Sequence, residues 1–322
     1  MKLKGSKILV IGGAGFIGSH AVAELLKTEI TQVVIYDNFA RGKPKYIAES
    51  LRDPRCTIWP HGGDIRDIDL LNDAMAGMDG VVHLAAMWLL HCRDYPRTAF
   101  HVNIEGTFNV LEACVENNIQ RLVYSSSASV YGDAAEVPMT ESHPFNNQNF
   151  YGATKIAGEA MCRAYHDRYG LDYVGLRYMN VYGPRQDQQA VYSGVIPIML
   201  NKINAGELPV INGDGSQAYD FIYVDDVARS NVLALEAETT DEFYNVGTGI
   251  QTTIRELCDA ILDLKQSTLE VTFKPYDDDD ARRLVQNRIG CPKLAAKQLD
   301  FRHEISLRDG LKKLIDWRDD GN

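Results

Sequence analysis

The chain has 322 residues, 45% hydrophobic and 24% charged, so it can bury a large core and has the composition of an ordinary globular protein. Its formal net charge of −11 argues against a nucleic-acid or anionic-membrane partner. Its six cysteines form no C-x-x-C pair and no apolar stretch reaches the ~18 residues of a membrane span, so we expect a cytoplasmic protein with no metal site and no disulfide frame.

The N-terminal segment combines an apolar run with three regularly spaced glycines. Residues 8–11 are Ile-Leu-Val-Ile and indicate a buried parallel strand, and residues 16–27 have apolar side chains at helical spacing. A strand that turns through glycines into a helix presents backbone N–H groups and the helix dipole to an anion. We expect a dinucleotide pyrophosphate there, with Gly12 in the tight turn, Gly15 beside the ligand and Gly18 at the helix–strand contact.

A glycine triplet alone is a weak signal, and the next segment strengthens it. The apolar residues 32–36 end in Asp37, about 20 residues further on, where a dinucleotide site places an acid. Such a carboxylate accepts both hydroxyls of the adenosine ribose and repels a 2′-phosphate. We therefore predict NAD rather than NADP, although Arg41 and Lys43 follow closely and leave the choice open. The alternative is that Asp37 is an ordinary turn residue.

A third strand over residues 56–60 leads to Asp64. At the carboxyl end of a parallel strand, this carboxylate could bond the exocyclic amine of adenine. It could also cap the helix predicted over residues 70–75, and both roles could hold. The fourth predicted strand, residues 79–86, contains His83, which we interpret as a hydrogen-bonded strand histidine rather than a catalyst.

A long helical pattern over residues 95–117 contains one amide, Asn103, among apolar side chains. A buried amide needs hydrogen-bond partners. We therefore expect Asn103 to hold the neighbouring strands and the cofactor loop in place.

The fifth predicted strand, residues 119–124, delivers three serines that end in Ser127 to the carboxyl edge of the sheet, where doubly wound folds bind ligands. Tyr151 and Lys155 follow on a helix and share one face because they are four residues apart. A phenol with a pKa of about 10 is a poor base at neutral pH, but an ammonium and a cationic nicotinamide nearby lower that pKa. We expect Tyr151 to take the proton of a sugar hydroxyl as hydride leaves the same carbon. Ser127 would position that oxygen, and Lys155 would bind the nicotinamide ribose.

These motifs together resemble the extended short-chain dehydrogenase/reductase family and, within it, the nucleotide-sugar epimerases and dehydratases. The resemblance rests on Gly12-x-x-Gly15-x-x-Gly18, Asp37, Asp64-Ile65, residues 83–86, residues 125–127 and Tyr151-x-x-x-Lys155. It implies an α/β fold, with a Rossmann-type doubly wound sheet of seven parallel strands, tightly held NAD and a smaller mixed α/β C-terminal domain for a nucleotide sugar. The implied domains are 1–178, with 225–250 returning to it, and 179–224 with 251–322. The resemblance also implies a homodimer built on a four-helix bundle from the helices of residues 95–117 and 150–169.

The resemblance assigns binding roles to single positions. The residues it implies for NAD are Gly12, Gly15, Phe16, Ile17, Gly18, Asp37, Asn38, Asp64, Ile65, Leu84, Ala85, Ala86, Asn103, Tyr151, Lys155 and Met179. Those it implies for the substrate are Trp88, Ser127, Asn180, Val195, Ile211, Tyr219, Arg282 and Arg283. Among them, Asn180 would contact the diphosphate, and Trp88 would either line the sugar site and narrow the space at C2 or simply pack.

One position departs from the family pattern. Related sequences commonly have a diphosphate-binding arginine where this chain has Tyr219. We expect Arg282 and Arg283 to make that contact instead, with Arg288 as a further candidate. The alternative is that they are surface arginines beside the acidic run 277–280.

The residues after Ser127 separate the reactions of this family. Its dehydratases and decarboxylating members have acidic residues there, whereas this chain has Ala128, Ser129 and Val130. The resemblance therefore implies a 4-epimerase that oxidises C4, lets the ketone rotate and returns hydride to the other face, with UDP-hexose as substrate by analogy only. A 4,6-dehydratase or a net oxidoreductase remains the alternative. A non-catalytic NAD-binding sensor typically lacks the tyrosine or the lysine that this chain retains.

Overall fold

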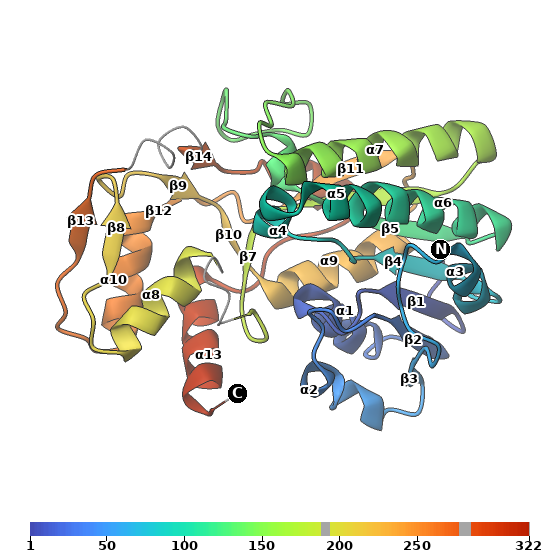
Figure 1. The fold of residues 1–322 in the computed structure, drawn as a ribbon, viewed down its shortest axis with the longest axis horizontal. Helices are drawn as coiled ribbons and strands as arrows, with labels where there is room; N and C mark the ends of the chain where they lie inside the picture. Colours follow the sequence, from blue (N-terminus) through green and yellow to red (C-terminus); the bar gives the residue numbers. More distant parts are fainter. Residues whose placement is uncertain (188–193, 277–284, 322) are drawn as a thin grey trace.

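The computed structural model describes residues 1–187, 194–276 and 285–321. Its centre is a seven-stranded sheet in the order β11-β6-β5-β4-β1-β2-β3, and every neighbouring pair is parallel (Figure 1). The predicted Rossmann-type sheet is therefore confirmed. The strands are β1 (Lys7–Ile11), β2 (Gln32–Tyr36), β3 (Cys56–Ile58), β4 (Gly80–His83), β5 (Arg121–Ser127), β6 (Tyr173–Tyr178) and β11 (Glu242–Val246).

The apolar runs form strands because both faces of the sheet are covered. Along β1, Ile8 and Val10 lie in one buried cluster, and Leu9 and Ile11 lie in another on the opposite face. Helices α1 (Phe16–Leu25) and α9 (Val224–Glu236) contribute to the first cluster. Helices α3 (Ile68–Met75), α6 (Gly106–Glu116) and α7 (Phe150–Tyr169) contribute to the second, and α6 and α7 run side by side in Figure 1. The strand order turns back at β1, so the crevice for a ligand lies at its carboxyl end.

A smaller lobe follows β6 and lies to the left in Figure 1. Its described residues contain three small sheets, in which β7 pairs with β10, β8 with β13, and β9 lies between β12 and β14. Their bounds are β7 (Asn180–Tyr182), β8 (Val210–Asn212), β9 (Ala218–Tyr219), β10 (Phe221–Tyr223), β12 (Thr252–Thr253), β13 (Thr272–Lys274) and β14 (Asn287–Arg288). Helices α8 (Val195–Asn204), α10 (Ile254–Leu264) and α13 (Leu307–Asp319) share its separate core.

The last part of the chain also contributes to the large sheet's core. Helix α12 (Lys293–Gln298) contacts β11, and Ala295, Leu299 and Phe301 lie in the same buried cluster as α1 and α9. The division into two domains at residues 178, 224 and 250 stays a prediction. The remaining short helices are α2 (Pro44–Ile47), η1 (Ser50–Arg52), α4 (Leu89–Asp94), α5 (Pro96–Ala99), η2 (Phe100–Glu105) and η3 (Ala128–Val130).

Two local expectations differ from the structure. The pattern over residues 95–117 is not one α-helix, because the six residues of η2 form a π-helical segment between α5 and α6. The N-cap of α3 is Asp67, whose carboxylate accepts a hydrogen bond from the N–H of Leu70, and not Asp64. A cap must directly precede the first helical residue, and Asp64 is three residues too early.

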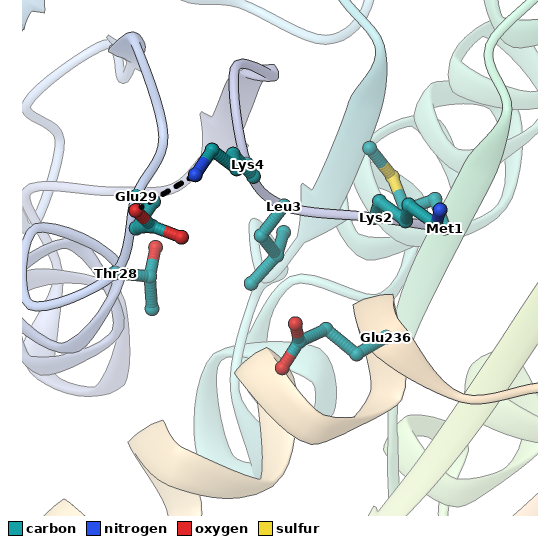
Figure 2. A pocket seen from close by; sticks show the side chains of 7 residues that line it. All are labelled: Met1, Lys2, Leu3, Lys4, Thr28, Glu29 and Glu236. Carbon is teal, nitrogen blue, oxygen red and sulfur yellow. Dashed lines mark hydrogen bonds and ion pairs between the residues drawn. The ribbon is translucent and has the colours of Figure 1, made fainter.

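A surface hollow of about 480 Å³ lies far from the carboxyl edge of the sheet (Figure 2). It is lined by residues 1–4 before β1, by Thr28 and Glu29 after α1, and by Glu236 at the end of α9. The ion pair between Lys4 and Glu29, 3.3 Å long, crosses its rim. Because it lies at the amino ends of the strands, it is not part of the predicted ligand crevice. No helix in the described ranges is both long and apolar enough to span a bilayer.

Candidate active site

The glycine turn after β1 is closely packed on both sides. A Cβ on Gly12, whose φ is +83°, would lie 2.8 Å from the backbone nitrogen of Ala85, and a Cβ on Gly18 would lie 2.1 Å from the carbonyl oxygen of Gly12. Only glycine fits either place. Helix α1 has Gly15 as its N-cap and no side chain that caps it, so its first N–H groups can bind an anion. These residues fit a dinucleotide pyrophosphate.

Asp37 holds this turn to the end of β2. Its carboxylate accepts hydrogen bonds from the N–H of Ala14 at 2.9 Å and of Phe39 at 2.8 Å, and burial raises its pKa. Asp37 is thus at the turn, beside Asn38, as the sequence predicts. Asp64 instead pairs with Arg66 at 2.5 Å, and this bond lowers the pKa of its carboxyl. An adenine contact from Asp64 stays a prediction.

The loop after β4 is tied to α7 through one amide. Asn103 accepts a hydrogen bond from the N–H of Met87 at 2.7 Å and donates to the Met87 carbonyl at 3.0 Å and to the Thr154 hydroxyl at 3.1 Å. The π-helical segment places Asn103 where it reaches both. Leu84, Ala85 and Ala86 lead into this loop, so the amide positions the part of the chain that passes the glycine turn.

His83 is a buried strand histidine, as predicted. Its Nε2 lies 3.1 Å from the Thr107 hydroxyl, and burial lowers its pKa to about 3. A neutral imidazole in the middle of the sheet cannot serve as an acid at neutral pH.

The structure brings together Ser127, Tyr151 and Lys155. Ser127 ends β5, and its side chain lies close enough to the Tyr151 phenol to lower the pKa of that phenol. Asn149 caps α7 through a 2.8 Å bond from the N–H of Gly152 to its side chain, and Tyr151 is therefore the second residue of the helix. The Lys155 ammonium lies 5.8 Å from the centre of the Tyr151 ring.

We expected a lowered pKa for Tyr151, but the protein alone raises it. Burial raises the pKa of Tyr151 to about 12, and the Ser127 side chain offsets only part of this rise. Burial also lowers the pKa of Lys155 to about 8, and its ammonium donates a 2.6 Å hydrogen bond to the Ser125 carbonyl. The Lys155 ammonium points at the Ser125 carbonyl rather than at the phenol. Loss of hydration around the Tyr151 phenol therefore has the largest effect on its pKa.

Two charged residues that we did not single out in the sequence support this group. Glu159 lies on α7 one turn beyond Lys155 and accepts two bonds from Arg177 of β6, at 2.9 and 2.7 Å. It also accepts a 2.5 Å hydrogen bond from Ser126, the neighbour of Ser127. The available signal was an arginine inside an otherwise apolar strand, because a buried arginine requires a buried acid.

The predicted substrate residues lie on several elements of the smaller lobe. Asn180 starts β7 and donates a 3.3 Å bond to the Asp220 carbonyl, while Val195 starts α8 and Ile211 is buried in β8. Met179 packs against Gly290, because a Cβ on that glycine would lie 2.5 Å from the terminal carbon of Met179. Whether these side chains contact a substrate stays a prediction.

Tyr219 faces an arginine on the neighbouring strand. It lies on β9 directly opposite Arg288 of β14, and its hydroxyl donates a 2.7 Å bond to the Val285 carbonyl. The Nε of Arg288 is buried and has no hydrogen-bond partner. Burial lowers the pKa of Arg288, while Tyr219 and Asp133 act in the opposite direction. The predicted Arg282 and Arg283 lie outside the described residues.

The two early cations, Arg41 and Lys43, each lie against an aromatic ring. The Arg41 guanidinium lies 4.7 Å from the centre of the Trp88 ring, and the ammonium of Lys43 lies 5.6 Å from the Tyr46 ring.

In the described ranges no three His, Cys, Asp or Glu side chains could hold a metal ion together; residues 277–280 lie outside those ranges.

Comparison with known proteins gives a consistent result. The profile described as "NAD dependent epimerase/dehydratase family" matches residues 8–247. The chain is 33% identical to the UDP-glucose 4-epimerase of Mycolicibacterium smegmatis, over 97% of this chain and 98% of that protein.

Two solved structures are similar along their whole length. The UDP-N-acetylglucosamine 4-epimerase of Methanobrevibacter ruminantium, in complex with UDP-N-acetylmuramic acid, has a TM-score of 0.92 and 33% identity, with 99% of this chain and 100% of that chain covered. The dTDP-glucose 4,6-dehydratase of Streptomyces venezuelae, crystallised with NAD, has a TM-score of 0.89 and 30% identity, with 98% and 97% covered.

The low pKa of Lys155 makes a prediction about stability. Its folded value of about 8 lies below the unfolded value of about 10.4. The folded protein therefore binds fewer protons than the unfolded chain between these values, and the cost of burying the ammonium falls as the pH rises through this window. We expect Lys155→Met to raise the free energy of unfolding more at about pH 7 than at about pH 10, measured by urea denaturation.

Lys297→Met, on the exposed side of α12, controls for the loss of a lysine. An equal gain for Lys155→Met at both pH values would contradict the prediction.

Proposed function

The chain belongs to the NAD-dependent epimerase/dehydratase family, and from that membership we propose that it inverts C4 of a nucleotide-diphosphate sugar, most directly a UDP-hexose, through a transient 4-keto sugar. The segment after Ser127 carries the proposal. It forms η3, which holds no carboxylate, and Glu159, on the same face of α7 as Tyr151, is committed to Arg177. None of the three residues directly after Ser127 is an acid that could eliminate water or assist loss of carbon dioxide.

The chemistry is assigned to the residues that the structure groups. Tyr151 removes the proton of the C4 hydroxyl and later returns it. Ser127, next to the Tyr151 phenol, holds the C4 oxygen, and Lys155 binds the cofactor ribose beside the Ser125 carbonyl. Bound NAD supplies the hydride acceptor and donor and, when oxidised, a positive charge that favours the phenolate. Because burial raises the pKa of Tyr151 to about 12, formation of the phenolate that takes the proton would depend on the positive charge of oxidised NAD.

The residues proposed to bind NAD include the glycine turn and the start of α1. The turn at Gly12, Gly15 and Gly18 with the first residues of α1, Phe16 and Ile17, takes the pyrophosphate. The other residues proposed to contact NAD are Asp37, Asn38, Asp64, Ile65, Leu84, Ala85, Ala86, Asn103 and Met179.

A product assay tests the reaction. Nucleotide sugars are incubated with the NAD-loaded protein and the products are identified by proton NMR, and we expect a sugar inverted at C4. A 4-keto-6-deoxy product would replace the epimerase with a 4,6-dehydratase, and a requirement for stoichiometric NAD would indicate a net oxidoreductase. The Tyr151→Phe variant should bind NAD and turn over about 10²- to 10⁴-fold more slowly, the usual contribution of a general base. Turnover at the wild-type rate would mean that another group is the base.

The diphosphate of the substrate needs a cation because the chain is acidic overall. Arg288 suits this role better than Tyr219, because it carries a charge. Its guanidinium is partly buried, has an unpartnered Nε and lies beside Tyr219 on the adjacent strand. We assign the diphosphate to Arg288 together with Asn180, and keep Arg282 and Arg283 as the candidates predicted from the sequence. Val195, Ile211 and Tyr219 are proposed to line the nucleotide.

Arg288→Gln tests this assignment. Loss of one charge-assisted hydrogen bond should raise KM for the nucleotide sugar about 10-fold to 100-fold and change kcat by less than about 3-fold, as steady-state kinetics would show. Arg282→Gln and Arg283→Gln serve as comparisons. An unchanged KM for Arg288→Gln with a raised KM for either of the others would transfer the contact to that residue.

An exposed aromatic face supports the proposed homodimer. Helices α6 and α7 pack together, and Phe108 of α6 contacts Tyr165 of α7 edge to face, with 5.8 Å between ring centres. Exposed aromatic side chains on or next to the helices at residues 95–117 and 150–169 are Tyr95, Phe100, Phe108, Phe150 and Tyr169. Exposed aromatic side chains of this kind are enriched at protein interfaces. The six cysteines are all free and buried, which supports the proposed cytoplasmic location.

Phe108→Glu should convert the dimer to a monomer, because the carboxylate would be buried without a partner in the bundle. Size-exclusion chromatography with light scattering measures the mass. Leu208→Glu, at an equally exposed apolar residue after α8, should leave the mass unchanged. A wild-type protein that is already monomeric would refute the four-helix bundle.

A further inference from the structure

Two loops flank the phosphate-binding turn from opposite sides. On one side, the N–H of Lys43 donates a 3.1 Å bond to the Ala14 carbonyl, and a Cβ on Gly42 would lie 2.8 Å from the Cβ of Ala14. On the other side, the Gly12 backbone packs against Ala85 of the loop after β4. Arg41 directly precedes Gly42 on the first side, and Trp88 follows Ala85 by three residues on the second. Their side chains therefore start on either side of the same turn.

These two side chains meet. The guanidinium of Arg41 stacks on the Trp88 ring at 4.7 Å, a distance typical of a cation–π contact. A planar guanidinium held in this way keeps its N–H groups directed outward in a fixed orientation. Its one acidic neighbour given by the structure, Asp187, is 3.5 Å away, which leaves donor capacity for another anion. The contact thus joins the loops after β2 and β4 next to the glycine turn.

Trp88 provides an independent sign of a ligand. Its indole Nε1 is buried and has no hydrogen-bond partner. A buried donor without an acceptor costs free energy, and an oxygen of a bound molecule would satisfy it. The buried donor and the outward guanidinium belong to the same pair of stacked side chains.

We propose that Arg41 and Trp88 form a clasp over the phosphate turn, in which Arg41 binds a diphosphate and the Trp88 N–H donates to an oxygen of the same ligand. Both the cofactor and the nucleotide sugar contain a diphosphate. The cofactor is the favoured source, because Arg41 lies four residues after Asp37 and directly precedes Gly42, which packs against Ala14 of the turn. Trp88 then belongs to the cofactor site rather than to the sugar at C2. This inference rests on NAD as the cofactor and is independent of the proposed epimerisation.

Release of bound NAD is the measurement that tests the clasp. The NAD-loaded protein is diluted into NADH, and exchange is followed through energy transfer from tryptophan to bound NADH; equilibrium affinity is obtained by titration calorimetry. Arg41→Gln should weaken NAD binding about 10-fold to 100-fold, as expected for one lost charge-assisted bond. Arg41→Lys should have an NAD affinity between those of the wild type and Arg41→Gln, because lysine keeps the charge but cannot form the planar stack. Trp88→Phe keeps an aromatic ring under Arg41 but loses the donor, and should weaken binding about 2-fold to 10-fold.

Arg255→Gln is the matched control. Arg255 also stacks on an aromatic ring, Phe273 at 5.7 Å, and pairs with an acid, Asp259 at 2.8 Å, but it lies on α10 in the smaller lobe. Its NAD affinity should equal that of the wild type. Thermal unfolding of each variant checks the fold, and Trp88→Phe tests the clasp separately if Arg41→Gln does not fold.

Binding of UDP to the NAD-saturated variants separates the two sources of diphosphate. An Arg41→Gln variant with weakened NAD binding and unchanged UDP affinity supports the proposal. Unchanged NAD release in both Arg41→Gln and Trp88→Phe overturns it. Weakened UDP binding with unchanged NAD binding also overturns it, because the guanidinium would then serve the nucleotide sugar. Neither outcome depends on turnover, so both are distinguishable from a failure of the proposed reaction.

Discussion

The buried ion pair between Arg177 and Glu159 is the interaction on which the geometry of the site depends. Their side chains are only 3% and 4% exposed, so both charges have lost their hydration, and breaking the pair would leave a buried charge uncompensated. The remaining hydrogen-bonding groups are satisfied. Arg177 donates to the Tyr131 hydroxyl and the Glu141 carbonyl, and Glu159 accepts from Ser126. Such a pair holds only one arrangement of β5, β6 and α7.

That arrangement brings the reactive groups together. Tyr151, Lys155 and Glu159 follow at intervals of four residues on α7 and share one face of the helix. Glu159 holds this face against Ser126, and the next residue along β5 is Ser127. The closeness of Ser127 to the Tyr151 phenol is therefore supported by a contact two helical turns away. The network continues through the Tyr131 hydroxyl to Asn245 of β11 at 2.7 Å, so the far edge of the sheet also supports the site.

The sequence was sufficient for the features that depend on local pattern, and insufficient for those that depend on contacts between distant segments. The apolar strands, the glycine turn and the i, i+4 spacing of Tyr151 and Lys155 are local, and all lie where we predicted them. The π-helical segment around Asn103 is not visible in a pattern of apolar residues, because one extra residue in a turn barely changes the spacing. The high pKa of Tyr151 was missed because it depends on burial by elements far along the chain. The same holds for the stack of Arg41 on Trp88, whose loops are 47 residues apart.

The overall charge explains why such stacks matter. With a net charge of −11, the long-range field of the protein repels the anionic ligands that the family binds. Attraction must come from single cations near the phosphate positions, and these must keep N–H groups directed at the ligand even where a carboxylate lies nearby, as Asp187 does 3.5 Å from Arg41. An arginine on an aromatic face meets this need, since the ring orients the guanidinium without neutralising it. Arg41 on Trp88 shows this arrangement at the glycine turn. Arg288 of β14 lies opposite Tyr219 on the adjacent strand, and its buried Nε has no hydrogen-bond partner, so it offers a second guanidinium with donor capacity for an anion.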